Sequence, residues 1–119
     1  MTPILAFDIE TVPDCEGIRR LYDLPADLHD REVAEVAFQK RRTLTGSDFL
    51  PPHLQRVIVI SCVLRDDEGL KVFSIGEPDV TEGAAIQRFF EGINKYVPQI
   101  ANPAPTTART MPRILVLAI

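Results

Sequence analysis

The chain has 119 residues, of which 45% are hydrophobic and 25% are charged, and its formal net charge is −4. This length supports one modest domain, and the composition is that of a folded globular protein, which excludes a disordered chain. A net negative charge argues against a protein that coats nucleic acid through a basic surface, although metal cations can offset carboxylates in an enzyme.

The first half of the sequence predicts a strand and then two helices. Ile4 to Ile9 is a short apolar run typical of a buried strand, and residues 11–14 are expected to break it. Residues 15–25 predict a short helix that Pro25 stops. A longer helix is expected from Asp30, as its cap, to about Leu44, with Gly46 as the stop. Its narrow apolar face would comprise Val33, Val36, Ala37 and the methylene stem of Lys40.

The second half predicts a β-hairpin and a helix. Arg56 to Leu64 is rich in Val and Ile and predicts a central strand, and Leu70 to Ile75 returns as a second strand after a turn. Asp79 and Glu82 have the spacing of a capping box that opens a helix, which Pro98 ends. The buried face of this helix is expected to be Ala85, Ile86, Phe89, Phe90, Ile93 and Val97. The order predicts a mixed α/β domain with an antiparallel start.

The composition changes near residue 99. All 17 acidic residues precede position 101, and residues 99–119 form an atypical tail, rich in Pro, Thr and Ala, that ends in an apolar run. This run, Ile114 to Ile119, is expected either to pair as a strand or to remain exposed.

Nothing at the start of the sequence predicts export or membrane insertion. Met1 leads through a short apolar run directly into acidic residues, without a basic leader or a cleavage site. The apolar stretch Val57 to Leu64 is far shorter than the roughly 20 residues of a membrane-spanning helix. The two cysteines, Cys15 and Cys62, have no spacing for zinc or redox chemistry. We therefore expect a cytoplasmic protein with no membrane partner, in which Cys62 is a buried, inert thiol.

Two carboxylates, Asp8 and Glu10, stand at the end of the first predicted strand. Since side chains alternate along a strand, both acids point to one face while Phe7 and Ile9 point to the other. Like charges on one face repel unless a cation offsets them. Carboxylate oxygens on a rigid strand suit Mg2+ or Mn2+ better than zinc. The pattern predicts a divalent metal site, and a solvated acid pair at a strand end is the alternative.

The stretch Ile4-Leu5-Ala6-Phe7-Asp8-Ile9-Glu10-Thr11 resembles the first motif of the DEDD, or DnaQ-like, exonucleases. Within that superfamily the chain is similar to the predicted 3'-5' exonucleases related to the proofreading domain of family B DNA polymerases. The resemblance covers residues 3 to about 98, and further stretches agree with it: Leu50-Pro51-Pro52-His53, Val57 to Leu64, and Phe89-Phe90. It implies an RNase H-like α/β fold, a mixed sheet flanked by helices, with residues 1–98 as the N-terminal part of an exonuclease domain.

The resemblance also implies two-metal hydrolysis of the 3' end of a nucleic acid, single-stranded DNA or RNA, with Mg2+ or Mn2+ as cofactor. Asp8 would bridge both ions, and Glu10 would bind the ion that holds the attacking water. Ile9 and Thr11 would lie against the terminal nucleotide, and a turn or cap role is the alternative for Thr11. Protein partners are not predicted.

The sequence departs from the family pattern after the last predicted helix. A DEDD site needs two further aspartates and a Tyr or His, yet no acid follows Gln99. Two ligands of four would hold metal weakly and would not clamp both sides of the scissile phosphate. We therefore expect a C-terminally incomplete domain with little or no nuclease activity. An altered C-terminus, from a frameshift, a misplaced gene end or a truncation, is our hypothesis for the departure.

Other polar and aromatic residues have simpler interpretations. His53 is expected to be structural or on the surface, and His29 to lie at a helix end. The run Lys40-Arg41-Arg42 either contacts a phosphate backbone or is the solvated C-terminus of a helix. The pair Phe89-Phe90 is expected in the core and not as a platform for bases.

Two other classes of function remain open. Aspartate-nucleophile phosphatases also carry an acid pair after a first strand, but their second acid is Asp and their Thr follows two positions later. Here Glu10 is longer, and Thr11 follows it directly. A non-catalytic RNase H-like remnant that binds nucleic acid or a partner protein is the non-enzymatic hypothesis.

Overall fold

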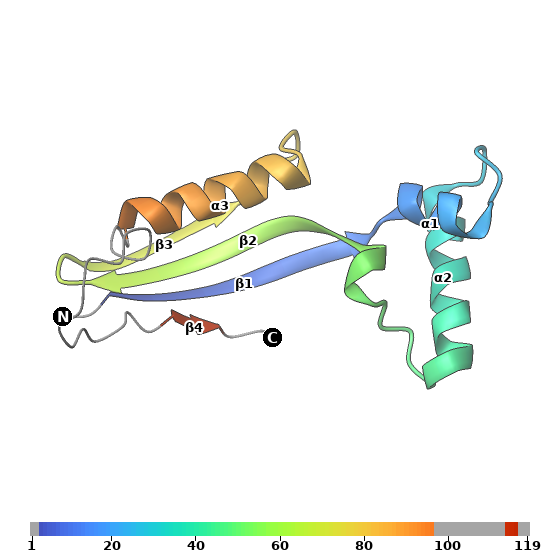
Figure 1. Ribbon diagram of the computed structural model, residues 1–119, viewed down its shortest axis with the longest axis horizontal. Helices are drawn as coiled ribbons and strands as arrows, with labels where there is room; N and C mark the ends of the chain where they lie inside the picture. The colour runs from blue at the N-terminus through green and yellow to red at the C-terminus, as the bar shows by residue number, and fades with distance from the viewer. Residues whose placement is uncertain (1–2, 97–113, 117–119) are drawn as a thin grey trace, which may run out of the picture. The chain divides into compact units, whose positions relative to one another are not determined.

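The computed structural model describes residues 3–96 and 114–116, with side chains for residues 3–95. Its elements are, in chain order, β1 (Ile4–Pro13), α1 (Cys15–Tyr22), α2 (Asp30–Thr45), the 3-10 helix η1 (Pro52–Leu54), β2 (Gln55–Asp66), β3 (Gly69–Ile75), α3 (Glu82–Tyr96) and β4 (Ile114–Val116) (Figure 1). The described residues form two compact units. Those within 1–10 and 58–119 are called the sheet unit here, and residues 11–57 the helical unit.

The sheet has the strand order β3-β2-β1-β4. The strands β2 and β3 form the predicted antiparallel hairpin, with Ile60 opposite Ile75 and Asp66 opposite Gly69. The arrows of β1 and β2 run in opposite directions in Figure 1, whereas β4 pairs with β1 in parallel. The sheet is therefore mixed and has helix α3 beside it. This arrangement confirms the predicted α/β class and is consistent with part of an RNase H-like fold.

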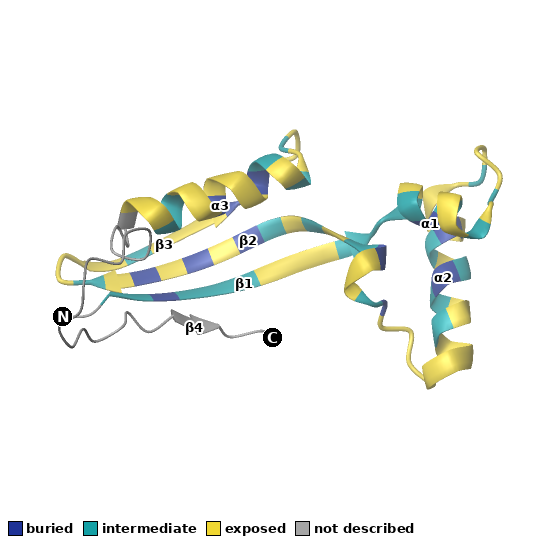
Figure 2. Cartoon of the chain, in the orientation of Figure 1, coloured by how far each residue is buried: buried dark blue, intermediate teal, exposed yellow. Residues whose placement is uncertain are grey.

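The core of the sheet unit lies between the sheet and α3. Ile60, Cys62 and Leu64 are buried at every second position of β2, which Figure 2 shows as alternating bands. Ala85 and Phe89, four residues apart on one face of α3, are also buried. Burying each large side chain stabilises the fold by roughly 1.5–3 kcal/mol. The predicted burial of Cys62 is confirmed, and it raises the pKa of the thiol.

The predicted buried face of α3 is partly wrong. Phe90 keeps 56% of its surface exposed and Ile86 is also exposed, although Phe89 is in the core. Successive helical residues are about 100° apart around the axis, so a helix lying on one face of a sheet buries a narrower stripe than the apolar pattern suggests. The predictions for Val97 and Pro98 lie outside the described residues.

The helical unit has its own core, formed by α1, α2 and the segment that leads into β2. Its buried residues are Ile18, Val33, Ala37, Leu50 and Leu54. Asp14 caps α1 by accepting a hydrogen bond from the Gly17 amide at 3.1 Å. Asp23, in the left-handed conformation, ends α1 before the predicted stop at Pro25, whereas Gly46 ends α2 as predicted.

The residues predicted to cap two helices are not the ones that do so. Helix α2 begins at Asp30, but the cap is His29, whose Nδ1 accepts from the Arg31 amide at 3.2 Å. Helix α3 is capped by Thr81 and not by Asp79, because the Thr81 hydroxyl accepts from the Ala84 amide at 3.2 Å. The imidazole nitrogen of His29 and the hydroxyl oxygen of Thr81 each accept from an amide of the first turn that has no partner within the helix.

Strand β1 is longer than predicted, since residues 11–13 continue it to Pro13 and do not break it. Val12 is β-branched, and proline is tolerated at a strand end where its missing amide is not needed for pairing. Within residues 3–96 and 114–116, the structure has no helix of the length and apolar character that crossing a bilayer requires. The predicted tail, residues 99–119, is described only as β4.

Candidate functional site

The packing of β1 against α3 defines which way its carboxylates point. Leu5 is buried, and the Phe7 ring lies 4.8 Å from the ring of Phe89 on α3, centroid to centroid. Both apolar side chains therefore face α3. Because strand side chains alternate, Asp8 and Glu10 project from the opposite face of β1.

No ion pair between described residues compensates the charge of the two carboxylates. Asp8 is half-buried, and its Oδ1 accepts a hydrogen bond from the amide of Ile9 at 2.9 Å, which holds the carboxylate against the strand. Glu10 is exposed. Among the described residues, neither acid is in an ion pair with a lysine or an arginine. Two like charges on one face are destabilising unless a cation from solution lies near them.

The donor set fits a hard cation but not a complete cage. Carboxylate oxygens are the ligands of Mg2+ and Mn2+, and Mg2+ usually binds through one or two carboxylates while keeping several waters. In the part of the chain that the structure describes, no group of three or more His, Cys, Asp or Glu side chains could hold a metal ion. Asp8 and Glu10 thus fit a hydrated ion held on one side only.

The two predicted substrate residues lie on either side of Glu10. Ile9 is 44% exposed and belongs to the strand face of Phe7, so a nucleotide on the acid face would meet its backbone and not its side chain. The Thr11 hydroxyl donates a hydrogen bond to Oε1 of Gln55. Thr11 is therefore a strand residue, and the turn or cap alternative is wrong.

Gln55 is a residue beside the candidate site that no sequence pattern had identified. Its side-chain amide donates to the Leu50 carbonyl while its oxygen accepts from Thr11. These residues line an open groove of the helical unit, with a volume of about 340 Å³. Finding Gln55 requires the pairing of two strands that are more than 40 residues apart in the sequence, which no local pattern reveals. Contact of Ile9 and Thr11 with a nucleotide stays a prediction.

The mixed sheet with α3 beside it is consistent with part of an RNase H-like exonuclease fold. Residues 47–103 match a protein family described as "Predicted 3'-5' exonuclease related to the exonuclease domain of PolB". Over this segment the chain is similar to that family, in agreement with the resemblance found in the sequence. Neither the curated proteins nor the solved structures gave a match to the chain.

The matched segment includes some of the predicted features and leaves out others. It contains η1, β2, β3 and α3, and with them the stretches Leu50-Pro51-Pro52-His53 and Phe89-Phe90. It supports a domain of the exonuclease type, and hence nucleic acid as the class of substrate. Residues 8–11 precede the segment, so the metal-binding role of Asp8 and Glu10 stays a prediction.

Proposed function

We propose that the chain is a 3'-5' exonuclease-type domain in which Asp8 and Glu10 bind Mg2+ or Mn2+ beside the 3' end of a nucleic acid. The observation that carries the proposal is the acid pair on one face of β1, in a chain whose residues 47–103 match an exonuclease family. An acid pair that no described residue compensates favours a cation, and a cation there attracts phosphate.

The residues of the chain have separate tasks in this proposal. Asp8, fixed by the Ile9 amide, presents an oxygen in a set direction, and the longer, exposed Glu10 adapts to the ion. Thr11, anchored on Gln55, and the backbone of Ile9 position the terminal nucleotide. When bound, such ions supply the Lewis-acid chemistry of phosphodiester hydrolysis.

Turnover by this chain is expected to be very low. Two carboxylates on one strand hold a cation from one side, whereas two-metal hydrolysis needs ions on both sides of the scissile phosphate. The test is release of the 3'-terminal nucleotide from an end-labelled single-stranded oligonucleotide in Mn2+, by the wild type and by Asp8→Asn. We expect no release above a metal-free control from either protein.

The other outcomes of this assay separate the parts of the proposal. Strong Mn2+-dependent release that Asp8→Asn abolishes would support the site and refute the low turnover. Release that survives in Asp8→Asn would show that the carboxylates are assigned wrongly.

A non-catalytic remnant is the second candidate function. It is favoured by the observation that the described residues contain no third ligand near Asp8 and Glu10. A remnant of this kind would bind a single-stranded oligonucleotide without shortening it, and with the same affinity in Mn2+ as in EDTA. An affinity that Mn2+ raises, and that Glu10→Gln returns to its value in EDTA, would favour the metal site instead.

A further inference from the structure

The three cationic residues near the end of α2, Lys40, Arg41 and Arg42, differ in whether they form ion pairs. Arg42 is neutralised, because its guanidinium lies 2.5 Å from Glu35 and 3.7 Å from Asp48. Lys40 and Arg41 form no ion pair with any described residue. Ion pairing within the helical unit therefore accounts for Arg42 alone, and the charges of Lys40 and Arg41 remain available to an anion.

Lys40 and Arg41 line a groove of the helical unit together with an aromatic ring and an imidazole. The groove has a volume of about 190 Å³, and its lining comprises Tyr22, Ala37, Lys40, Arg41, Leu44, Pro51, His53 and Leu54. No carboxylate is in that lining, although the chain as a whole has a formal net charge of −4. Local positive charge in an acidic chain is a specific feature and not a consequence of composition.

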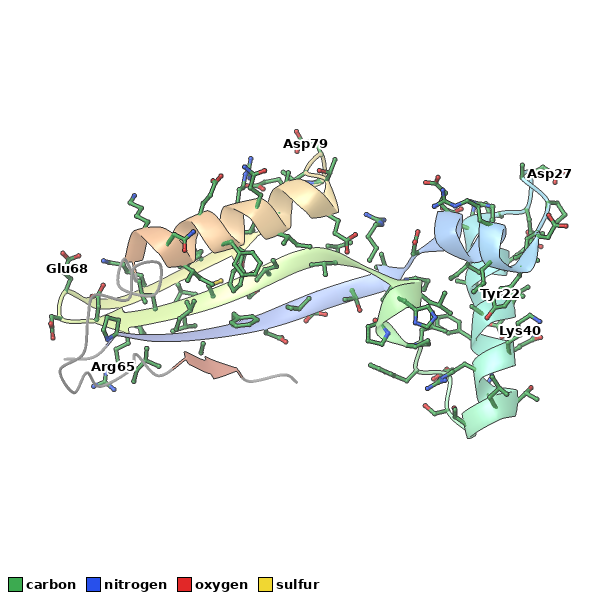
Figure 3. All side chains as sticks on the ribbon, viewed as in Figure 1. Tyr22, Asp27, Lys40, Arg65, Glu68 and Asp79 are labelled. Carbon is green, nitrogen blue, oxygen red and sulfur yellow. The ribbon has the colours of Figure 1, made fainter. Side chains whose placement is uncertain are left out.

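Both cations are oriented by neighbouring groups. The Lys40 ammonium lies 4.8 Å from the centroid of the Tyr22 ring, a cation–π contact that Figure 3 shows between α1 and α2. Arg41 donates its Nε–H to the Phe49 carbonyl at 3.1 Å. One of the five N–H donors of a guanidinium is thus used, and four remain available for a ligand.

The chemistry of this groove is that of a phosphate site. Arginine presents a planar fork that matches two phosphate oxygens, and lysine supplies a point charge. The groove, of about 190 Å³, has room for a phosphate group in place of water. The tyrosine ring and the aliphatic residues of the lining suit a sugar better than they suit an acidic peptide side chain.

We propose that Lys40 and Arg41, with Tyr22 and His53, bind phosphodiester groups of a single-stranded nucleic acid in this groove. The identification of the ligand as nucleic acid rests on the function proposed above. Contacts of this kind position a strand without reading its sequence. They also make binding depend on salt, because each neutralised phosphate releases counterions.

The test is fluorescence anisotropy of a labelled oligothymidylate with the full chain in EDTA, at several salt concentrations. The double variant Lys40→Gln/Arg41→Gln is compared with Arg20→Gln/Arg31→Gln, which removes the same charge from exposed residues of α1 and α2 outside the groove. We expect the groove variant to bind on the order of tenfold more weakly. The slope of log affinity against log salt should fall by roughly 1.4, about 0.7 for each lost phosphate contact. The control variant should stay close to the wild type.

Three results would overturn the proposal: no oligothymidylate binding by the wild type, an equal loss in both double variants, or equal binding of a polyglutamate peptide at the same sites. Far-UV circular dichroism and thermal unfolding check that both double variants are folded, and the single variants replace the groove double variant if it is not. The groove proposal and the metal-site proposal can fail independently. Asp8→Asn should leave oligothymidylate binding in EDTA unchanged, and the groove variant should leave Mn2+ uptake unchanged.

Discussion

Ile18 has no exposed surface, whereas Leu21, on the same helix, keeps 56% of its surface exposed. Both residues have helical spacing in the sequence, and the pattern alone does not separate them. The structure does, because Ile18 contacts α2 and the segment around Leu50 and Leu54 in the core of the helical unit.

We expect Ile18→Ala to lower the free energy of unfolding by about 2–5 kcal/mol, since it leaves a cavity in a closely packed core. Leu21→Ala should change the same quantity by less than about 0.5 kcal/mol. Urea unfolding followed by circular dichroism measures both. Similar losses in the two variants would contradict the assigned core.

Gly76 follows β3 with a φ of 145°, a conformation that residues with a side chain rarely adopt. A Cβ there would lie 2.2 Å from the Ile58 carbonyl oxygen, while a Cβ on Gly83 in α3 would meet nothing within 4 Å. We therefore expect Gly76→Ala to lower the free energy of unfolding by about 1–3 kcal/mol. Gly83→Ala should raise it by as much as about 1 kcal/mol through helix propensity. Thermal unfolding that ranks the two variants the other way would show that the turn after β3 is placed wrongly.

At the scale of the element, the order of strands and helices could be predicted from periodicity, and the ends of the elements could not. The hairpin of β2 and β3 follows from two β-branched runs around a turn. Strand β1 reaches Pro13 because Thr11 finds a partner in Gln55, which is distant in the sequence. The N-terminal caps of α2 and α3 were predicted near the correct positions but on the wrong residues. Packing of each helix decides which of its first amides need a side-chain partner.

The cap of α3 gives an element-scale prediction. Thr81→Ala removes the hydroxyl that accepts from the Ala84 amide and should lower the free energy of unfolding by about 1 kcal/mol. Asp79→Ala, at the position that the sequence favoured, should have little effect, and Thr81→Ser should retain most of the stability. If denaturant unfolding showed a larger loss of unfolding free energy in Asp79→Ala than in Thr81→Ala, Asp79 would be the cap, as the sequence predicted.

At the scale of the whole molecule, the α/β class and the similarity to an exonuclease family could be predicted, because each rests on patterns spread over many residues. The division of the described residues into a sheet unit and a helical unit could not, since it depends on which apolar faces meet. Two carboxylates two residues apart on a strand identify the candidate site, and the strand period alone implies that they share a face. Only the structure shows that no described residue pairs with them as a cation, and that Lys40 and Arg41 line a groove.

The most direct test of the account is isothermal titration calorimetry of the full chain with Mn2+. The wild type should take up the ion weakly, because the carboxylates hold it from one side, and Asp8→Asn/Glu10→Gln should abolish the uptake. Asp79→Asn/Glu91→Gln, which removes the same charge from exposed acids of the sheet unit, should leave it unchanged. No uptake by the wild type, or equal uptake by the wild type and Asp8→Asn/Glu10→Gln, would contradict the claim that this acid pair is a metal site.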